Sequence, residues 1–191
     1  SPDNKVLFSS KYAISSKNDT LLKFNHLFKA VRAWSAESPN LYTLVMNNLD
    51  KNGKVKESIA HRFGFRTVKM CDGLLLVNGV ALKLKGVNRH EHDPHTGRTI
   101  TVASMVEDIR LMKLFNINAV RTSHYPNRPE WYELCDKYGL YLVGEANLES
   151  HGMENSDLKT LADKPDWRQA FHDRMYRMMM RDRNSTSIII W

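Results

Sequence analysis

The pattern of apolar and polar positions changes character near residue 70. Before that point the chain alternates in the manner of β-strands, with LYTLVMNNL followed by DKNGK, VKESIAHRF and GFRTVKM. Asn52-Gly53 lies between two strand-like runs and predicts a β-hairpin whose two turn residues both have positive φ. No helical period appears here, so residues 1–70 are predicted to form part of a β-sandwich, since they are few for a complete one.

After residue 70, strand-like and helical segments alternate. GLLLVNGVALKLKGVN predicts two short strands around Asn78-Gly79. The runs LKLKGVN, INAVRTS, LYLVGEAN and SIIIW are nearly unbroken apolar strands, which is typical of a parallel sheet with helices outside it.

Three helices are predicted between these strands. A capping box at Ser104–Glu107 opens the first, which has three apolar residues on one face: Met105, Ile109 and Met112. Pro129 begins the second helix and Gly139 ends it. The third spans residues 166–183, and four of its apolar residues are expected to face inward: Phe171, Met175, Met178 and Met179.

The repeating units fit either a doubly wound sheet or a (β/α)8 barrel. No glycine-rich phosphate loop follows any strand, which counts against a dinucleotide-binding fold. Three successive strands instead end in polar side chains, which is typical of a barrel whose site lies at the C-terminal face. A whole barrel needs about 250 residues and only about 120 follow residue 70, so residues 71–191 are predicted to form half of one.

The histidine-rich stretch after the first of these strands allows three interpretations. His90, Glu91, His92 and His95 resemble a zinc cluster, but zinc needs three or four convergent ligands, and Glu91 faces away from its neighbours in an extended segment. Hydrogen bonding to a sugar or other substrate by one histidine is a second interpretation. Ordinary loop residues that satisfy one another are the third.

The next two strand ends carry Arg121 with His124, and Glu149 with His151. A guanidinium at the end of an apolar strand predicts an anionic partner in the barrel mouth. His124 is either a site residue or a buried histidine bonded to a loop. Glu149 and His151 point to the same side of an extended segment and could bind Mg²⁺ if a third ligand came from elsewhere. Ordinary surface polarity is the alternative.

Composition and charge exclude several classes of function. The chain has 191 residues, 42% of them hydrophobic, and no apolar run long enough for a membrane span. Its net charge of +7 is scattered, and the densest arginine cluster, at residues 174–183, has acidic neighbours. We therefore expect neither a nucleic-acid nor a membrane partner. No secretion signal is visible, so a cytoplasmic location is expected.

Several long motifs together resemble the LacZ-type β-galactosidases of glycoside hydrolase family 2. They are GVNRHEHDPHTGR, MVEDIRLMKLFNINAVRTSHYPNRPEWYELCDKYGLYLVGEANLESHGM and RDRNSTSIIIW. Upstream, WSAESPNLYTLV and GFRTV look like the immunoglobulin-like domain that precedes the barrel in this family. The resemblance implies a multidomain β plus α/β fold. Residues 1–70 would be a partial immunoglobulin-like β-sandwich, and residues 71–191 would be the first half of a (β/α)8 TIM barrel.

The resemblance implies a retaining glycosidase that cleaves terminal β-galactosides such as lactose, in a parent enzyme that is a homo-oligomer. His90 and His124 look like the histidines that bind the galactosyl ring, and Arg121 like the arginine that orients the nucleophile. Glu149 and His151 look like Mg²⁺ ligands. Gly144 departs from the pattern, since close relatives often have Asp there, which leaves the local surroundings of the site open.

The resemblance also implies that the two catalytic carboxylates lie beyond Trp191. The acid/base Glu follows the fourth barrel strand, where it would also be the third Mg²⁺ ligand, and the nucleophile belongs to a later strand. Glu145 takes neither role, because it follows the third strand. The 191-residue chain alone is therefore expected to be inactive and to bind Mg²⁺ weakly or not at all. The alternatives are a β-glucuronidase of the same family and a non-catalytic sugar-binding or complementing module.

Overall fold

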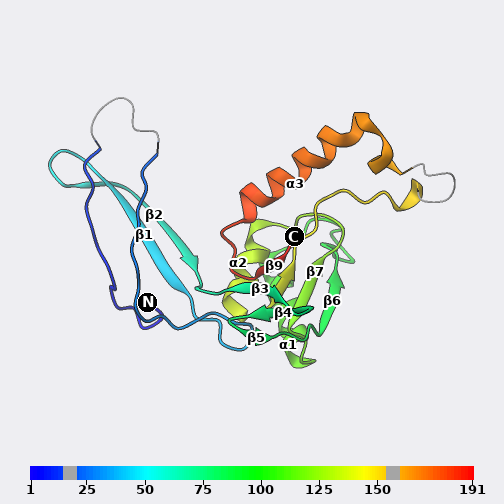
Figure 1. Ribbon diagram of the computed structural model, residues 1–191, viewed down its shortest axis with the longest axis horizontal. Helices are drawn as coiled ribbons and strands as arrows, with labels where there is room; N and C mark the ends of the chain where they lie inside the picture. The colour runs from blue at the N-terminus through cyan, green and yellow to red at the C-terminus, as the bar shows by residue number, and fades with distance from the viewer. Residues whose placement is uncertain (15–20, 154–159) are drawn as a thin grey trace.

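A computed structural model describes residues 1–14, 21–153 and 160–191. Within these ranges the strands form three separate sheets. A long hairpin stands apart from the rest of the molecule, and a parallel sheet with its helices forms the larger body (Figure 1). A small three-stranded sheet lies between the two.

The hairpin consists of two antiparallel strands, β1 (Tyr42–Leu49) and β2 (Val55–Phe63). The predicted hairpin is confirmed, but its turn is not the predicted one. Gly53 has a φ of 80°, whereas Asn52 lacks the positive φ of a two-residue turn. The Asp50 carboxylate shapes a longer loop instead, because it accepts hydrogen bonds of 2.9 Å from the N–H groups of Asn52 and Lys54.

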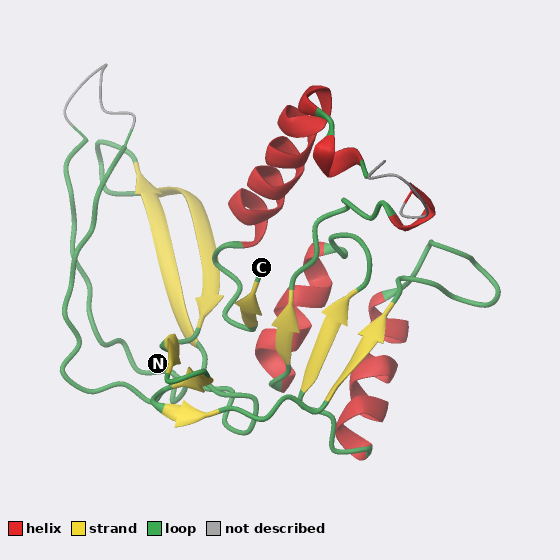
Figure 2. Cartoon of the chain, turned by 45° about the vertical axis from the view of Figure 1, so that its right-hand side comes forward, coloured by secondary structure: helices red, strands yellow, loops and turns green. Residues whose placement is uncertain are grey.

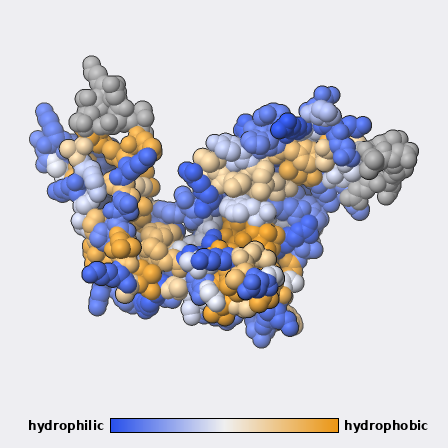
Figure 3. Space-filling model, in the orientation of Figure 1, coloured by the Kyte–Doolittle hydropathy of each residue, from blue (hydrophilic) through white to orange (hydrophobic). Residues whose placement is uncertain are grey.

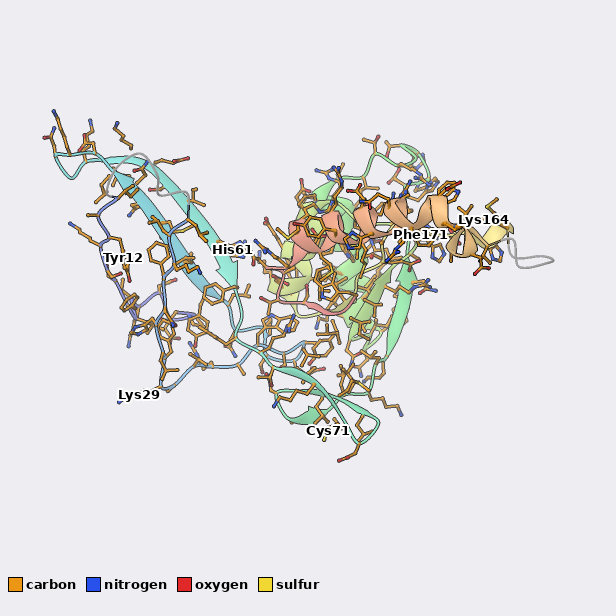
Figure 4. The ribbon with its side chains drawn as sticks, turned by 45° about the horizontal axis from the view of Figure 1, so that its top comes forward. Tyr12, Lys29, His61, Cys71, Lys164 and Phe171 are labelled. Carbon is orange, nitrogen blue, oxygen red and sulfur yellow. The ribbon has the colours of Figure 1, made fainter. Side chains whose placement is uncertain are left out.

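Much of the apolar surface of this hairpin is exposed, as the orange patches in its part of Figure 3 show. Leu44, Val45 and Ile59 are each about half exposed, at 46%, 55% and 50%. The N-terminal segment runs alongside, where the ring of Tyr12 meets that of Phe24 edge-on with centroids 4.7 Å apart (Figure 4). The assignment of residues 1–70 to an immunoglobulin-like sandwich stays a prediction.

The small sheet has the strand order β3 (Val68–Cys71), β4 (Leu74–Val77) and β5 (Val80–Ala81). Asn78 and Gly79 close the β4–β5 turn with φ values of 51° and 80°. These are the two positive φ values that a tight hairpin turn requires, and the two strands predicted around this pair are confirmed.

The larger body is built on four parallel strands in chain order: β6 (Gly86–Arg89), β7 (Ala119–Thr122), β8 (Tyr141–Val143) and β9 (Ile188–Ile190). Two helices cover one face of this sheet (Figure 2): α1 (Val102–Leu114) and α2 (Pro129–Tyr138). Their inward residues make the main core with the strands, and Met105, Ile109 and Met112 of α1 are buried as predicted. A parallel sheet whose strands follow one another in chain order is the arrangement of a (β/α) barrel.

The third helix, α3 (Arg168–Asp182), leads into β9 and follows three short 3₁₀ turns, η1 (His151–Met153), η2 (Leu161–Asp163) and η3 (Pro165–Trp167). The prediction that four apolar residues face inward is only partly right. Met178 is buried, Phe171 and Met175 are half-buried, and Met179 is 41% exposed. The reason is that α3 extends away from the sheet and packs mainly near its C-terminal end (Figures 1 and 4).

None of the helices in the described ranges is long and apolar enough to cross a membrane.

The start of α1 corrects another prediction. The helix begins at Val102, and Thr101 is its N-cap with extended dihedrals of −103° and 160°. The Thr101 hydroxyl accepts a hydrogen bond of 3.1 Å from the N–H of Ser104. Ser104 is therefore the third residue of the helix instead of its cap, and Glu107 pairs with Arg110 at 2.7 Å.

Replacing Thr101 with alanine is expected to lower the free energy of unfolding by about 1 kcal/mol, because the N–H of Ser104 loses its acceptor. Urea unfolding followed by circular dichroism measures this. The matched control is Ser104→Ala, which leaves the cap intact and is expected to change little. A larger loss in Ser104→Ala than in Thr101→Ala would show that the helix begins at Ser104 after all.

The second helix has both predicted boundaries. Pro129 occupies its first turn, and Gly139 ends it in the left-handed conformation with a φ of 77°. Gly139 also allows a close approach of the chain, since a Cβ atom there would lie 2.2 Å from the carbonyl oxygen of Ala36. The residues that precede β1 therefore pack directly on the end of α2.

Trp34 anchors this N-terminal region to the parallel sheet. Its side chain is fully buried, its indole N–H donates to the Asp136 carbonyl at 2.8 Å, and its ring meets Tyr141 edge-on at 5.7 Å. Gly64 packs against it so closely that a Cβ atom would lie 2.5 Å from Trp34 Cβ. The N–H of Gly64 donates to Thr186 Oγ1 at 2.7 Å, which ties the end of β2 to the start of β9.

Arg66 makes a second connection between these regions. Its guanidinium donates to the backbone carbonyls of Thr186 and Ile188, at the start of β9. On the other side, the Asp136 carboxylate accepts the N–H groups of Thr186 and Ser187 at 3.0 and 2.7 Å. Burial raises the pKa of Asp136 although these donors oppose the shift, and burial lowers the pKa of Arg66.

Candidate active site

The loops after β6, β7 and β8 meet at one edge of the parallel sheet, where the strands end (Figure 2). Parallel strands bring their carboxyl ends to the same edge, so residues far apart in the sequence become neighbours there. Five residues from these loops and from β7 lie in or beside this edge: His90, Arg121, His124, Glu145 and Glu149.

Arg121 lies on β7 and projects toward Glu145, with 2.6 Å between Arg121 Nε and Glu145 Oε2. The N–H does not point at this oxygen, so the contact is an ion pair without hydrogen-bond geometry. Arg121 Nη1 also donates to Asn88 Oδ1 of β6 at 3.4 Å. The sequence predicts an anionic partner for Arg121, and Glu145 is the one that lies beside it.

His124 lies between two carboxylates. Its Nδ1 is 2.8 Å from Glu145 Oε1, and its Nε2 is 3.7 Å from Glu149 Oε1. Arg121 Nη2 lies 3.2 Å from the same Nδ1. Glu145 therefore contacts the arginine and the histidine with one oxygen each, and it is the centre of the cluster.

Sequence reasoning sets Glu145 aside because of its place after the third strand. The structure brings it between two of the predicted site residues. Its backbone N–H donates to Thr122 Oγ1 at 3.0 Å, and Thr122 is fully buried on β7. Its side chain is 22% exposed. The signal that could have found it is that Glu145 is the first carboxylate after β8, the strand beside the one that carries Arg121, which is predicted to need an anionic partner.

His90 faces the same cluster. Its ring meets that of His124 edge-on with centroids 5.3 Å apart, and Tyr125 lies 5.9 Å away. Glu91 turns to the other side, where it is buried and accepts the N–H of Arg128 at 3.0 Å. The alternation expected for this stretch is therefore present, and only His90 of this pair faces the cluster.

A buried network behind the site holds the end of β6, and sequence reasoning missed it. Arg89 is 6% exposed, and its guanidinium lies 3.7 Å over the ring of Trp131. Its Nε is 2.9 Å from Asp108 Oδ2, and its Nη1 donates to Asn127 Oδ1 at 2.9 Å. Because Arg89 directly precedes His90, this network fixes the backbone from which the His90 side chain extends.

Glu149 and His151 lie beyond β8 with exposed side chains. Outside the two gaps in the described chain, no three His, Cys, Asp or Glu side chains converge as ligands for a metal ion. This arrangement does not offer the three or four ligands that zinc needs. The Glu149 carboxylate is the oxygen donor that Mg²⁺ prefers, whereas the His151 imidazole is a less typical donor for an ion that keeps most of its water ligands.

A shallow hollow of about 240 Å³ lies against β6, β7 and β8 beside the cluster. Five of the residues that line it are Gly86, Asn88, Ala119, Arg121 and Val143. The Arg121 side chain thus stands where this hollow meets the polar cluster, and a small polar ligand held there would contact charged and apolar surface together.

Comparison with known proteins places both parts of the chain in one family. The family model described as glycosyl hydrolases family 2, TIM barrel domain, matches residues 68–191. The model described as glycosyl hydrolases family 2 matches residues 3–66.

Curated relatives include two bacterial β-galactosidases. That of Vibrio vulnificus (strain YJ016) is 50% identical over 174 residues, which are 91% of this chain and 17% of the relative. That of Yersinia enterocolitica is 55% identical over 158 residues, which are 83% of this chain and 15% of the relative. The chain thus spans about a sixth of the length of these relatives.

Solved structures with a similar fold include enzymes named for acidic sugars. The β-glucuronidase of Ruminococcus gnavus is 31% identical with a TM-score of 0.74, and the match covers 83% of this chain and 27% of the glucuronidase chain. The family 2 β-galacturonidase of Eisenbergiella tayi bound to galacturonate is 31% identical with a TM-score of 0.68, and the match covers 84% of this chain and 27% of the galacturonidase chain. The chain belongs to glycosyl hydrolase family 2, and residues 68–191 are part of the TIM-barrel domain of that family.

Proposed function

We propose that this chain is part of a retaining β-galactosidase that hydrolyses terminal non-reducing β-D-galactose residues, as in lactose. The observation that carries the proposal is the identity of 50 to 55% to β-galactosidases over most of the chain. The cluster at the carboxyl ends of the strands supports it, because that is where the sites of barrel enzymes lie.

In this proposal the residues of the chain bind and orient, and the two reacting carboxylates come from another part of the enzyme. His90 and His124 hydrogen-bond the galactosyl ring and stabilise it more strongly in the transition state. Arg121 orients the nucleophile carboxylate. Hydrolysis proceeds by double displacement, with one carboxyl group as acid/base and another as nucleophile, about 5 Å apart.

Mg²⁺ is the metal that we propose for the complete site. Glu149 would supply an oxygen and His151 a nitrogen, with water in most other positions and a further ligand from outside this chain. When bound, the ion would add positive charge beside the reacting sugar. Glu149 Oε1 lies 3.7 Å from His124 Nε2, so a residue that would hold the metal and a proposed sugar-binding histidine are neighbours.

The same family also supports a β-glucuronidase as the second candidate, because solved neighbours of that activity are 29 to 31% identical to this chain. The higher identity to β-galactosidases favours the first candidate. We also propose that residues 1–70 belong to an immunoglobulin-like domain, since the matched family segment before the barrel ends with a long antiparallel hairpin.

The full-length protein that carries this chain is expected to hydrolyse nitrophenyl β-galactoside with a kcat/KM at least about 10²-fold higher than for the β-glucuronide. The reason is that a site built to hydrogen-bond a neutral sugar lacks a partner for the extra carboxylate of a uronic acid. Measuring kcat/KM for both substrates at one pH tests this. A preference for the glucuronide would establish the second candidate instead.

The purified 191-residue chain is expected to give no turnover in the same assay. Within the described residues, the carboxylates of the cluster are Glu145 and Glu149, which lie on opposite sides of the His124 ring, and Glu145 is already paired with Arg121. Galactoside turnover at enzyme-like rates by this chain would contradict the assignment of the reacting carboxylates. Galactose binding without turnover, seen by tryptophan fluorescence, would support a sugar-binding module.

A further inference from the structure

We propose that Glu145 is a positioning residue that sets the orientation of Arg121 and the tautomer of His124. The proposal rests on the proposed function for its kinetic consequence, but its structural part stands alone. One carboxylate contacts both groups, with 2.6 Å to Arg121 Nε and 2.8 Å to His124 Nδ1.

The backbone holds Glu145 firmly in place. Its N–H donates to Thr122 Oγ1 at 3.0 Å, and Arg121 pairs with Val143 in the β7–β8 register, two residues before Glu145. Glu145 lies just beyond the end of β8, and its contact of 2.6 Å with Arg121 Nε places its side chain on the face from which Arg121 projects. The carboxylate thus reaches both partners from the segment that directly follows β8.

The chemistry of Glu145, Arg121 and His124 decides which nitrogen of the His124 ring carries the proton. A carboxylate only accepts hydrogen bonds and a guanidinium only donates them. Both lie near His124 Nδ1, with Glu145 Oε1 at 2.8 Å and Arg121 Nη2 at 3.2 Å. The shorter contact requires a hydrogen on Nδ1, so neutral His124 carries its proton there. Nε2 lies 3.7 Å from Glu149 Oε1, which is beyond hydrogen-bond distance, so that carboxylate does not hold the proton on Nε2.

This tautomer decides what His124 offers a sugar. With the proton on Nδ1, Nε2 accepts a hydrogen bond from a hydroxyl group of the substrate. Without the Glu145 acceptor, Arg121 Nη2 becomes the partner of Nδ1 and donates to it, so that the proton of neutral His124 moves to Nε2. His124 would then present a donor in place of an acceptor.

The structural part is tested by NMR on the 191-residue chain with ¹⁵N-labelled histidine, at a pH where the imidazole is neutral. The wild-type chain is expected to show the His124 proton on Nδ1, and Glu145→Leu, which removes the acceptor, is expected to move it to Nε2. The matched control is Glu107→Leu, which removes an exposed carboxylate paired with Arg110 on α1. An unchanged His124 tautomer in Glu145→Leu would overturn the proposal.

The kinetic part is tested in the full-length enzyme with a nitrophenyl β-galactoside. Glu145→Gln is expected to lower kcat/KM by about 10²-fold, mostly through kcat, because the misplaced groups act on the transition state. Glu145→Asp keeps the charge and is expected to recover part of the loss, while Glu107→Gln stays at the wild-type value. Values of kcat and KM within about twofold of wild type in Glu145→Gln would overturn the proposal.

The NMR and kinetic experiments distinguish a failure of the positioning role of Glu145 from a failure of the proposed function. A wild-type enzyme without activity on galactosides would reject the proposed function, and the NMR result would still decide whether Glu145 sets the tautomer. An active wild-type enzyme with an equally active Glu145→Gln variant would reject the positioning role alone.

Discussion

Trp34→Ala is expected to lower the free energy of unfolding by about 3–5 kcal/mol, the usual cost of removing a buried tryptophan. Trp34 is fully buried between the N-terminal region and the parallel sheet. Its loss leaves a cavity beside Tyr141 and Gly64 and removes the hydrogen bond to the Asp136 carbonyl. Urea unfolding, followed by circular dichroism and by fluorescence of the remaining tryptophans, measures the change.

The chain offers a matched control in Trp167, which is 40% exposed at the start of α3. Trp167→Ala removes the same side chain from a site that is open to water, so its effect is expected to be much smaller. If both variants unfold at the same urea concentration, then Trp34 is not the residue that fastens the N-terminal region to the sheet.

Arg89→Ala is expected to be nearly as damaging, with a loss of about 3 kcal/mol. Removal of a buried guanidinium leaves Asn127 and the carboxylate of Asp108 without their partner and exposes one face of Trp131. Arg89→Lys is expected to recover little, because an ammonium group has neither the planar stacking surface nor the forked donors of arginine.

The control for this variant is Arg110→Ala on the exposed side of α1. Arg110 has the same charge and pairs with Glu107 at 2.7 Å, but both side chains are more than half exposed, at 59% and 54%. Exposed ion pairs contribute little to stability, so the unfolding midpoint is expected to stay where it is. Equal midpoints for Arg89→Ala and wild type would mean that the network behind His90 is not needed for folding.

The order of elements could be predicted because local signals agree with the global fold. Apolar strands, Pro129 and Gly139 mark boundaries that do not depend on distant contacts. The predictions that failed concern positions where the surrounding structure decides the outcome. Thr101 is the N-cap because its backbone is extended and its hydroxyl accepts the N–H of Ser104, three residues later. Met179 stays exposed because α3 extends away from the sheet.

The candidate site could be predicted as a group, but not as a set of contacts. Strand ends place His90, Arg121 and His124 at one edge whatever the details of pairing. Which carboxylate meets Arg121 depends on the register of β7 against β8, where Arg121 lies opposite Val143. That register is set by packing across the sheet, and spacing along the sequence does not contain it.

Arg66 has a consequence for how this sheet can grow. Within the described residues β9 is the last strand of the parallel sheet, and no strand lies beside its other edge. Its Ser187 and Ile190 carbonyls accept N–H groups of Leu142 and Gly144 on the β8 side, while those of Thr186 and Ile188 are held by Arg66. A guanidinium thus occupies the acceptors that an incoming strand would need. Arg66 therefore blocks strand pairing at the first part of this edge, and a further strand would pair with β9 beyond Ile188 or displace Arg66.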